Sequence, residues 1–324
     1  GIIPKSMTEA VTVLIPKEGD VHSPSNFRPI TLLNVDYKLM TKTINKSFFS
    51  KFLNDNLSDE QLCAVPGRDI RNGTILIRDI ISYCKSKGIS ASIVSLDQKK
   101  AFDMVDRCFL YKILKALKVN SRVLRFVDTI YCNTHTSIQV NGHLSSKIPL
   151  QRGVRQGCPL SATLYVIYVH AFISYISKST DFSGISLPGG KQCKVSAYAD
   201  DLVLFCKDKY DEDYIFSFFD EVSSATGSTL NKSKTNILHI GPKPFSSVYQ
   251  RTNVKICGIH FDFQNNGVLS FKECETKIDK RIQKYKHLPL TLHGKVLICN
   301  TMLFPLLFYA AATYLPAKSF CENI

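Results

Sequence analysis

The strongest constraint on this fold is a pair of adjacent carboxylates, Asp200 and Asp201, set between two short β-prone runs. Residues 194–205 therefore predict a β-hairpin with acids at its tip. Like charges this close raise each other's pKa unless a cation lies between them, and residues 195–205 contain no basic side chain. A divalent cation such as Mg²⁺, which takes oxygen ligands, would relieve the repulsion. A solvated Asp-Asp turn explains this local pattern equally well.

A third carboxylate stands at the end of a short apolar segment earlier in the chain. The run Ser92–Leu96 is β-like, and Asp97 follows it directly. Three carboxylates could hold two metal ions roughly 3.5–4 Å apart, an arrangement that activates a hydroxyl nucleophile and stabilises a pyrophosphate leaving group. The sequence thus offers a candidate metal site for phosphoryl transfer.

The charge balance favours a polyanionic partner. Lysine and arginine total 41 against 27 acidic residues, a net charge of +14. Such an excess concentrates phosphate backbones by electrostatic steering and counterion release. A basic surface without a partner is the alternative. With 44% hydrophobic and 21% charged residues in 324, the composition is that of a folded protein with two domains, or one large domain with an appendage.

The 11 cysteines are scattered, and no Cys-x-x-Cys pair occurs, which argues against a zinc site. Isolated thiols are typical of a reducing compartment, so cytoplasm or nucleus is expected. The chain begins at Gly1 without methionine or signal segment, which suggests a piece of a longer protein. The apolar runs Leu164–Ile176 and Met302–Leu315 are shorter than the roughly 20 residues of a membrane span, so we predict two core helices and no membrane partner.

Strand-like and helical periodicities alternate through the first 240 residues, which indicates an α+β fold. Helices are predicted over 109–117, 160–176 and 216–224. The turn formers at Gly241–Pro244 or Asn265–Gly267 suggest a boundary. Beyond it, one amphipathic helix is predicted from an apolar stripe at helical spacing, formed by Phe271, Cys274, Ile278, Ile282 and Tyr285. Its other side is basic, with Lys277, Lys280, Arg281 and Lys284, and suits either solvent or a nucleic-acid backbone.

Several segments, taken together, resemble one known family. Tyr198–Asp201, the sequence Tyr-Ala-Asp-Asp, matches the hallmark hairpin of reverse transcriptases. Further blocks, in the family's order, resemble the enzymes of non-LTR (LINE-type) retrotransposons: 15–17, 26–30, 61–68, 95–103, 152–161, 227–235, 257–261 and 292–309. Two departures are Cys63-Ala-Val, where many relatives have Gly-Phe, and Ser161-Ala162, where relatives usually have Ser-Pro. The blocks cover nearly the whole chain.

The resemblance implies a right-hand polymerase core, with fingers and a palm of antiparallel sheet plus helices over 1–242. A primer grip and a partial helical thumb would occupy 243–324. The implied activity is RNA-directed DNA polymerisation during retrotransposition, in which deoxynucleotides are added to a primer 3′ end with two Mg²⁺ ions, or Mn²⁺ in their place. The implied partners are an RNA template, a DNA primer, deoxynucleoside triphosphates and the remainder of a longer retroelement polyprotein. A nuclear location is favoured.

The resemblance also assigns roles to residues. The catalytic metal ligands would be Asp97, Asp200 and Asp201. The deoxynucleotide would be bound by Lys17, Arg28, Phe102, Gln156 and Gly157. Of these, Lys17 and Arg28 would close over the triphosphate, and Phe102 would exclude a ribose 2′ hydroxyl.

Other basic residues would act on the leaving group or on nucleic acid. Lys234 would protonate the departing pyrophosphate. The expected nucleic-acid contacts are Arg68, Lys277, Lys280, Arg281 and Lys284. Two alternatives stay open: a group II intron maturase-type reverse transcriptase, and a catalytically inactive nucleic-acid-binding remnant of a retroelement.

Overall fold

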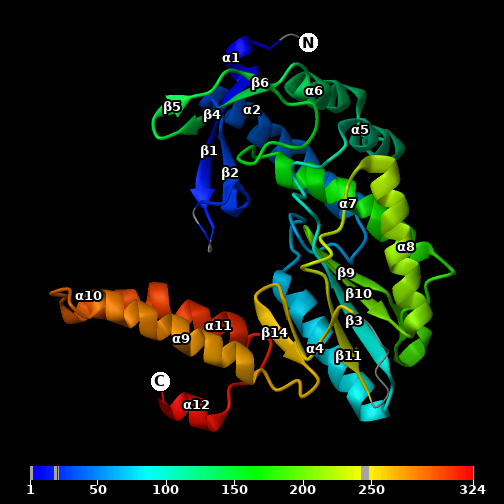
Figure 1. Ribbon diagram of the computed structural model, residues 1–324, viewed down its shortest axis with the longest axis vertical. Coiled ribbons are helices and arrows are strands. Elements are labelled where there is room, and N and C mark those ends of the chain that lie inside the picture. The colour runs from blue at the N-terminus through cyan, green and yellow to red at the C-terminus, as the bar shows by residue number, and fades with distance from the viewer. Residues whose placement is uncertain (1–2, 18–19, 21, 242–247, 324) are drawn as a thin grey trace. The chain divides into compact units, whose positions relative to one another are not determined.

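The computed structural model describes residues 3–17, 20, 22–241 and 248–323, which fold into two compact units (Figure 1). Each unit is assembled from three separate stretches of chain. Unit 1 comprises Gly1–Arg68, Asp97–Ser179 and Ile215–Asn231. Unit 2 comprises Asp69–Leu96, Thr180–Tyr214 and Lys232–Ile324. The predicted boundary between 242 and 243 lies outside the described residues, so that division stays a prediction.

Unit 1 contains a five-stranded sheet in the order β2-β1-β4-β5, with β6 also pairing with β4. The long strands β1 (Glu9–Pro16) and β2 (Phe27–Leu32) are antiparallel, and β1 runs parallel to β4 (His135–Val140). Two short strands, β5 (His143–Leu144) and β6 (Ile148–Pro149), complete it. Strand β1 therefore lies at the centre, with β2 forming a hairpin beside it.

Helix α7 (Ser161–Lys178) is the core of unit 1, because its residues are apolar around most of its circumference. The predicted burial of the run Leu164–Ile176 is confirmed for most of its residues. Phe172 packs against Phe219 of α8 (Lys209–Thr226), with ring centroids 6.4 Å apart. The remaining helical elements of this unit are α1 (Lys5–Thr8), η1 (Pro24–Asn26), α2 (Val35–Ile44), η2 (Asn45–Phe49), α3 (Ser50–Asn56), α5 (Arg107–Ala116) and α6 (Ser121–Tyr131).

The main sheet of unit 2 has the order β12-β11-β3-β10-β9. Its strands are β3 (Ala91–Leu96), β9 (Val195–Tyr198), β10 (Asp201–Cys206), β11 (Asn236–Ile240) and β12 (Gln250–Arg251). Helix α4 (Ile70–Lys87) covers the sheet (Figure 1), and its Ile77, Ile80 and Ile81 join a core that contains Ile93 and Val203. Strand β3 is therefore the central strand of the five, and nearly all of its residues are buried.

The rest of unit 2 consists of small hairpins and a helical C-terminal part. Helix α8 (Lys209–Thr226) begins in this unit and ends in unit 1. The short strands are β7 (Ile185–Ser186), β8 (Gln192–Cys193), β13 (Asn253–Ile256) and β14 (Ile259–Asp262), with the short helix η3 at Pro188–Gly190. The helical elements are α9 (Val268–Tyr285), α10 (Leu292–Ile298), η4 (Cys299–Leu303), α11 (Phe304–Ala311) and α12 (Lys318–Asn323). The predicted amphipathic helix at 271–285 is thereby confirmed.

The second apolar run, Met302–Leu315, does not form the core helix that we expected. Residues 302–311 belong to one longer helix, Leu292–Ala311, and only 11% of an 18-residue stretch of this helix is buried. Phe304 and Phe308 are 40% and 67% exposed, because this helix packs along one side against α9 and leaves the other side open. By length and composition alone, it is the one helix among the described residues that could span a membrane, which is weak evidence for such a role.

Candidate functional site

The predicted acidic hairpin is present in unit 2. Tyr198 of β9 pairs with Asp201 of β10, so Ala199 and Asp200 form the two-residue turn. Ala199 has a φ of 53°, in the left-handed region that alanine rarely adopts. Such strain costs on the order of 1–3 kcal/mol and persists only where the surrounding structure imposes it. Leu202–Cys206 are buried, and this apolar base holds the turn in place.

Asp97 follows the central strand of the same sheet. Leu96, the last residue of β3, pairs with Leu202, the second residue of β10. Within unit 1, the Asn231 amide donates a hydrogen bond of 2.9 Å to Oδ2 of Asp97, and the Asn231 backbone N–H donates to the Asp97 carbonyl. The predicted site residues did not include Asn231, which the sequence marks only as a polar turn residue before β11.

The Asp201 carboxylate has neighbours from the C-terminal part of unit 2. The Cys257 thiol, at the turn between β13 and β14, donates to Oδ2 of Asp201 at 3.8 Å. The Tyr309 hydroxyl of α11 donates to the Cys257 carbonyl. Burial, together with the nearby Cys257, Tyr198 and Asp201, raises the pKa of Tyr309 to about 12. The β13–β14 turn is therefore held between α11 and the acidic hairpin.

The described residues contain no group of three or more His, Cys, Asp or Glu side chains close enough to hold a metal ion. Of the three predicted ligands, Asp200 and Asp201 belong to unit 2 and Asp97 belongs to unit 1. Their donor atoms are carboxylate oxygens, which suit Mg²⁺ in chemical type.

Two of the predicted nucleotide-binding residues lie on the β1–β2 hairpin of unit 1. Arg28 is exposed on β2 and pairs with Ile15 of β1. Lys17 follows β1, and its backbone N–H donates to the Asn26 carbonyl at 2.7 Å. Both side chains are exposed, as cations that contact a phosphate must be.

Gln156 and Gly157 pack closely against β2 in unit 1. The Thr31 N–H donates to the Gln156 carbonyl at 2.7 Å, and a Cβ on Gly157 would lie 2.4 Å from the Thr31 oxygen. The Gln156 amide donates to the Asp103 carboxylate at 3.2 Å, beside a cavity of about 420 Å³ that both residues line. Burial raises the pKa of Asp103, although Gln156, Lys100 and Lys17 oppose the shift. The predicted site residues did not include Asp103.

Phe102 lies half-buried in unit 1 against the first turns of α7. Its ring stacks on that of Tyr165, with centroids 4.7 Å apart and planes 13° from parallel. The Val154 N–H donates to the Phe102 carbonyl at 2.8 Å. Phe102 is thus packed on Tyr165 and still partly exposed.

The remaining predicted residues occupy separate places. Lys234 is exposed in the turn before β11. The Arg68 guanidinium donates to the carbonyls of Leu57, Ser58 and Gln61, so Arg68 closes the loop that follows α3. A template contact for Arg68 stays a prediction. On α9, Lys277, Lys280, Arg281 and Lys284 follow one another, and the Arg281 guanidinium donates to the Met302 carbonyl.

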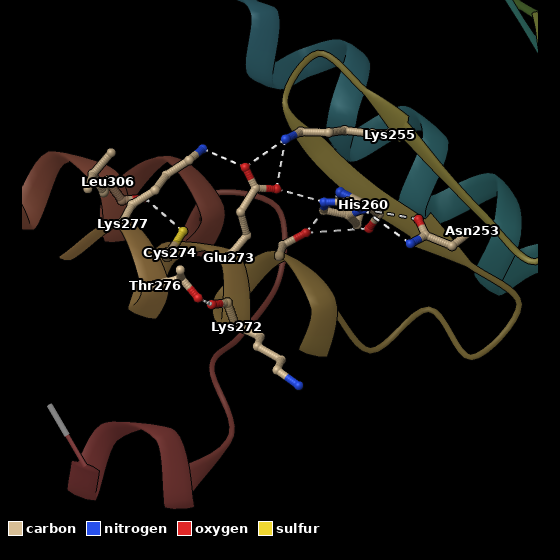
Figure 2. A network of polar contacts seen from close by, with 10 residues as sticks. Asn253, Lys255, His260, Lys272, Glu273, Cys274, Thr276, Lys277 and Leu306 are labelled. Atoms are coloured by element: carbon tan, nitrogen blue, oxygen red, sulfur yellow. Dashed lines mark hydrogen bonds and ion pairs between the residues drawn. The ribbon is translucent and has the colours of Figure 1, made fainter. Parts of the chain in front are cut away.

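Figure 2 shows that Lys277 belongs to a group of charged and polar residues around Glu273. We call Glu273, Lys255, His260 and Lys277 the Glu273 cluster. The carboxylate binds Lys255 of β13, His260 of β14 and Lys277, all at 2.6–2.7 Å. Burial works to raise the pKa of Glu273, but the three hydrogen bonds outweigh it and lower the pKa to about 2. The Glu273 cluster therefore joins α9 to the β13–β14 hairpin.

Comparisons with known proteins agree on one family. A family profile described as reverse transcriptase (RNA-dependent DNA polymerase) matches residues 15–261. An uncharacterized 149 kDa protein of transposon TX1 from Xenopus laevis is 30% identical over 335 residues, covering 100% of this chain and 26% of the relative. The retrovirus-related Pol polyprotein of the type-2 retrotransposable element R2DM from Drosophila melanogaster is 24% identical, covering 96% of this chain and 30% of the relative. The chain thus spans under a third of these relatives, and the expected resemblance to a non-LTR retrotransposon domain is confirmed.

Solved structures confirm the fold. Apo telomerase from Candida tropicalis, truncated from its C-terminal domain, has a TM-score of 0.58 at 14% identity, covering 82% of this chain and 55% of that one. Telomerase from Candida albicans in complex with the TWJ fragment of telomeric RNA has a TM-score of 0.55 at 14% identity, covering 99% of this chain and 62% of that one. The predicted right-hand α+β polymerase fold is therefore confirmed.

Proposed function

Because the chain belongs to the reverse transcriptase (RNA-dependent DNA polymerase) family, we propose that it adds deoxynucleotides to a primer 3′ end on an RNA template. Its relatives are parts of longer Pol polyproteins, so the reaction would serve the retrotransposition of such an element. Fingers and palm would occupy 1–242, and primer grip and partial thumb 243–324. A nuclear place of action is part of the same proposal.

The acidic hairpin carries this proposal. Phosphoryl transfer needs little covalent chemistry from the protein and depends on positioning and on neutralising charge. Asp200 and Asp201 stand at a strained turn on buried strands, which is a rigid support for charged groups. Nothing in this scheme requires a protein nucleophile.

Polymerases of this family generally use divalent metal ions. The carboxylate oxygens of Asp97, Asp200 and Asp201 are of the type that would hold them, with Mg²⁺ or Mn²⁺ as the ions. When bound, the metal would lower the pKa of the primer 3′ hydroxyl and neutralise the pyrophosphate charge. The Asn231 amide, donating to Oδ2 of Asp97, would orient that carboxylate.

The incoming deoxynucleotide would be held by unit 1. Lys17 and Arg28 would bind the triphosphate, since the arginine fork matches phosphate oxygens in bidentate fashion. Gln156, oriented by Asp103, and the bare backbone of Gly157 would lie beneath the nucleotide. Phe102 would crowd a ribose 2′ hydroxyl. Lys234 would protonate the pyrophosphate.

The nucleic acids would be bound through the net charge of +14. A neighbour in fold, the telomerase from Candida albicans, was solved with an RNA fragment, which supports an RNA template here. On α9, Lys280 and Lys284 are exposed and would contact the backbone of the duplex together with Arg281 and Lys277. Arg68 would contribute only if its loop contacts the template.

Primer extension tests the proposal. The protein is incubated with poly(rA)/oligo(dT), dTTP and Mg²⁺, and incorporation is measured. We expect incorporation by the wild type and a loss of roughly a hundredfold to a thousandfold in Asp200→Asn, the scale of removing a principal electrostatic group from an active site. The matched control is Asp220→Asn, on the exposed face of α8, which should keep wild-type activity.

Two outcomes would contradict the proposal. Equal incorporation by wild type and Asp200→Asn would remove the acidic hairpin from the chemistry. Tight binding of the primer–template by a wild type that incorporates nothing would instead favour the inactive nucleic-acid-binding remnant.

A further inference from the structure

We propose that Tyr165 and Gln98 position Phe102, and that they thereby set how strongly the enzyme prefers deoxyribonucleotides over ribonucleotides. The inference rests on the proposed function, because it takes Phe102 to be the side chain that meets the sugar. It adds two residues of unit 1, Gln98 four positions before Phe102 and Tyr165 on α7, which act on the sugar only through Phe102.

The first observation is the stack itself. The rings of Phe102 and Tyr165 lie nearly parallel, 4.7 Å apart between centroids. Tyr165 is fully buried, whereas Phe102 is partly exposed. Because the buried Tyr165 ring fills the space beneath the Phe102 ring, the Phe102 ring cannot move inward. We call the Tyr165 ring the floor of Phe102.

The second observation is that the floor is anchored. The Tyr165 hydroxyl donates to Oε1 of Gln98 at 3.0 Å, and Gln98 is only 8% exposed. A buried hydroxyl and a buried amide each lose free energy if left unpaired, so this bond fixes the ring along its long axis.

The third observation is that Gln98 itself is clamped at its backbone. Gln98 forms an isolated antiparallel bridge with Leu230. On either side, the Lys99 N–H donates to the Thr229 carbonyl at 2.9 Å and the Asn231 N–H donates to the Asp97 carbonyl at 2.8 Å. The segment that carries Asp97 thus also carries the anchor of the Phe102 floor.

Phe102 is held from the opposite side as well. Its carbonyl accepts from the Val154 N–H, and the next residue, Asp103, accepts from the Gln156 amide. The backbone of Phe102 is therefore fixed, and the ring's depth depends on what lies beneath it. Shrinking Tyr165 would let the Phe102 ring sink and would open space where a 2′ hydroxyl could fit.

The test compares the ratio of kcat/KM for dTTP to that for UTP on poly(rA)/oligo(dT). We expect Tyr165→Leu to lower this ratio by roughly tenfold or more, the scale at which an apolar pocket discriminates small groups. Phe102→Val, which removes the ring that meets the sugar, should lower it at least as far.

The matched control lies on the same helix. Tyr168 is also fully buried on α7, and its hydroxyl bonds to Ser228, but its ring packs on Phe109 and Phe172. Tyr168→Leu should weaken the fold about as much as Tyr165→Leu and leave the ratio at the wild-type value.

A second set of variants covers the case in which Tyr165→Leu does not fold. Tyr165→Phe and Gln98→Leu each break the same hydrogen bond and keep the stack. Each should lower the ratio by a few-fold, and the double variant should lower it no further, because both changes remove one interaction.

The outcomes separate the two levels of the argument. An unchanged ratio in Tyr165→Leu with a lowered ratio in Phe102→Val would overturn the role of Tyr165 and leave the proposed function standing. If the ratio fell equally in Tyr165→Leu and Tyr168→Leu, the role of Tyr165 would also be overturned, because the effect would then be a general one of disturbing α7. An unchanged ratio in Phe102→Val would refute the sugar contact itself, and a wild type without incorporation would refute the polymerase.

Discussion

At the scale of single residues, Gly157 and Gly142 share a positive φ but differ in what lies beside them. Gly157 has a φ of 117°, and its Cα faces the Thr31 carbonyl so closely that any Cβ would overlap it. A glycine at this point lets the backbone after Gln156 lie against β2. Gly142 has a positive φ of 82° as well, but it lies in an open turn.

The two glycines allow a matched prediction. Gly157→Ala should lower the free energy of unfolding by more than about 1–3 kcal/mol, since backbone strain and overlap with Thr31 add together. Gly142→Ala should cost only the strain of the positive φ, about 1–2 kcal/mol. Urea denaturation measures both, and the KM for dTTP should rise in Gly157→Ala alone. Equal destabilisation of the two variants would mean that the approach to Thr31 does not matter.

The motifs in the sequence name single positions, and the structure supplies the residues that these positions contact. The resemblance supplied Phe102 and Gln156 by motif, but Tyr165 and Asp103 became visible only through contacts in the structure. A short sequence motif does not identify a stacking partner that lies far along the chain. For Arg68 the template contact stays a prediction, and the structure adds that its guanidinium donates to three backbone carbonyls.

At the scale of elements, the patterns that encode burial predicted the structure well. The hairpin at 194–205 and the helix at 271–285 are both present, because a short run of β-prone apolar residues and an apolar stripe at helical spacing each mark residues that become buried. The prediction of a core helix at 302–315 was wrong, because an apolar run indicates hydrophobicity and not the presence of a packing partner. In the structure this helix packs against α9, and its last turn joins the core of unit 2 through Ala310, while Phe308 stays exposed.

The Glu273 cluster gives a prediction at this scale. Folding lowers the pKa of Glu273 from 4.5 to about 2, so the folded state binds this proton less readily than the unfolded state. The stabilisation is therefore complete above pH 4.5 and is lost as the pH falls from there toward 2. Glu273→Gln should weaken the hydrogen-exchange protection of Ile259–Asp262 at pH 7, and the difference from wild type should shrink at pH 3.

The control for this prediction is Glu275→Gln, two positions further along α9. Its carboxylate is partly exposed, and this variant should match the wild type at both pH values. A difference between wild type and Glu273→Gln that stays constant down to pH 3 would show that packing, and not the charge, holds the hairpin to α9.

At the scale of the whole molecule, the net charge of +14 sets how binding responds to salt. Each cation that contacts a phosphate contributes about one unit to the slope of log affinity against log salt. Removing two exposed lysines of α9, as Lys280→Gln/Lys284→Gln, should reduce the slope by about two. Fluorescence anisotropy of a labelled primer–template between about 50 and 200 mM salt measures it.

Lys38→Gln/Lys42→Gln provides the control, because these lysines have the same spacing on α2. It should leave the slope unchanged. An equal reduction by both pairs would indicate diffuse attraction to the basic surface and would remove α9 from the nucleic-acid interface.

The division into two units could not be read along the chain. Turn-rich segments near 241–267 suggested one boundary, because composition changes locally there. That boundary stays a prediction; the two compact units each take three separated segments, and the pairing that joins these segments is long-range. Family resemblance anticipated the fold because it carries that long-range information, which periodicity does not.

The central position of β3 has a consequence for synthesis on the ribosome. Its neighbours β10 and β11 are made later, and β11 ends about 140 residues downstream of Leu96. At roughly 5–20 residues per second, β3 would wait on the order of 7–30 s for its last partner. During that time Ile93 and Val94, fully buried in the finished sheet, would be exposed on the nascent chain. We therefore expect chaperones to cover β3 while the chain emerges. A truncation before Asn236 would leave β3 with one unpaired edge.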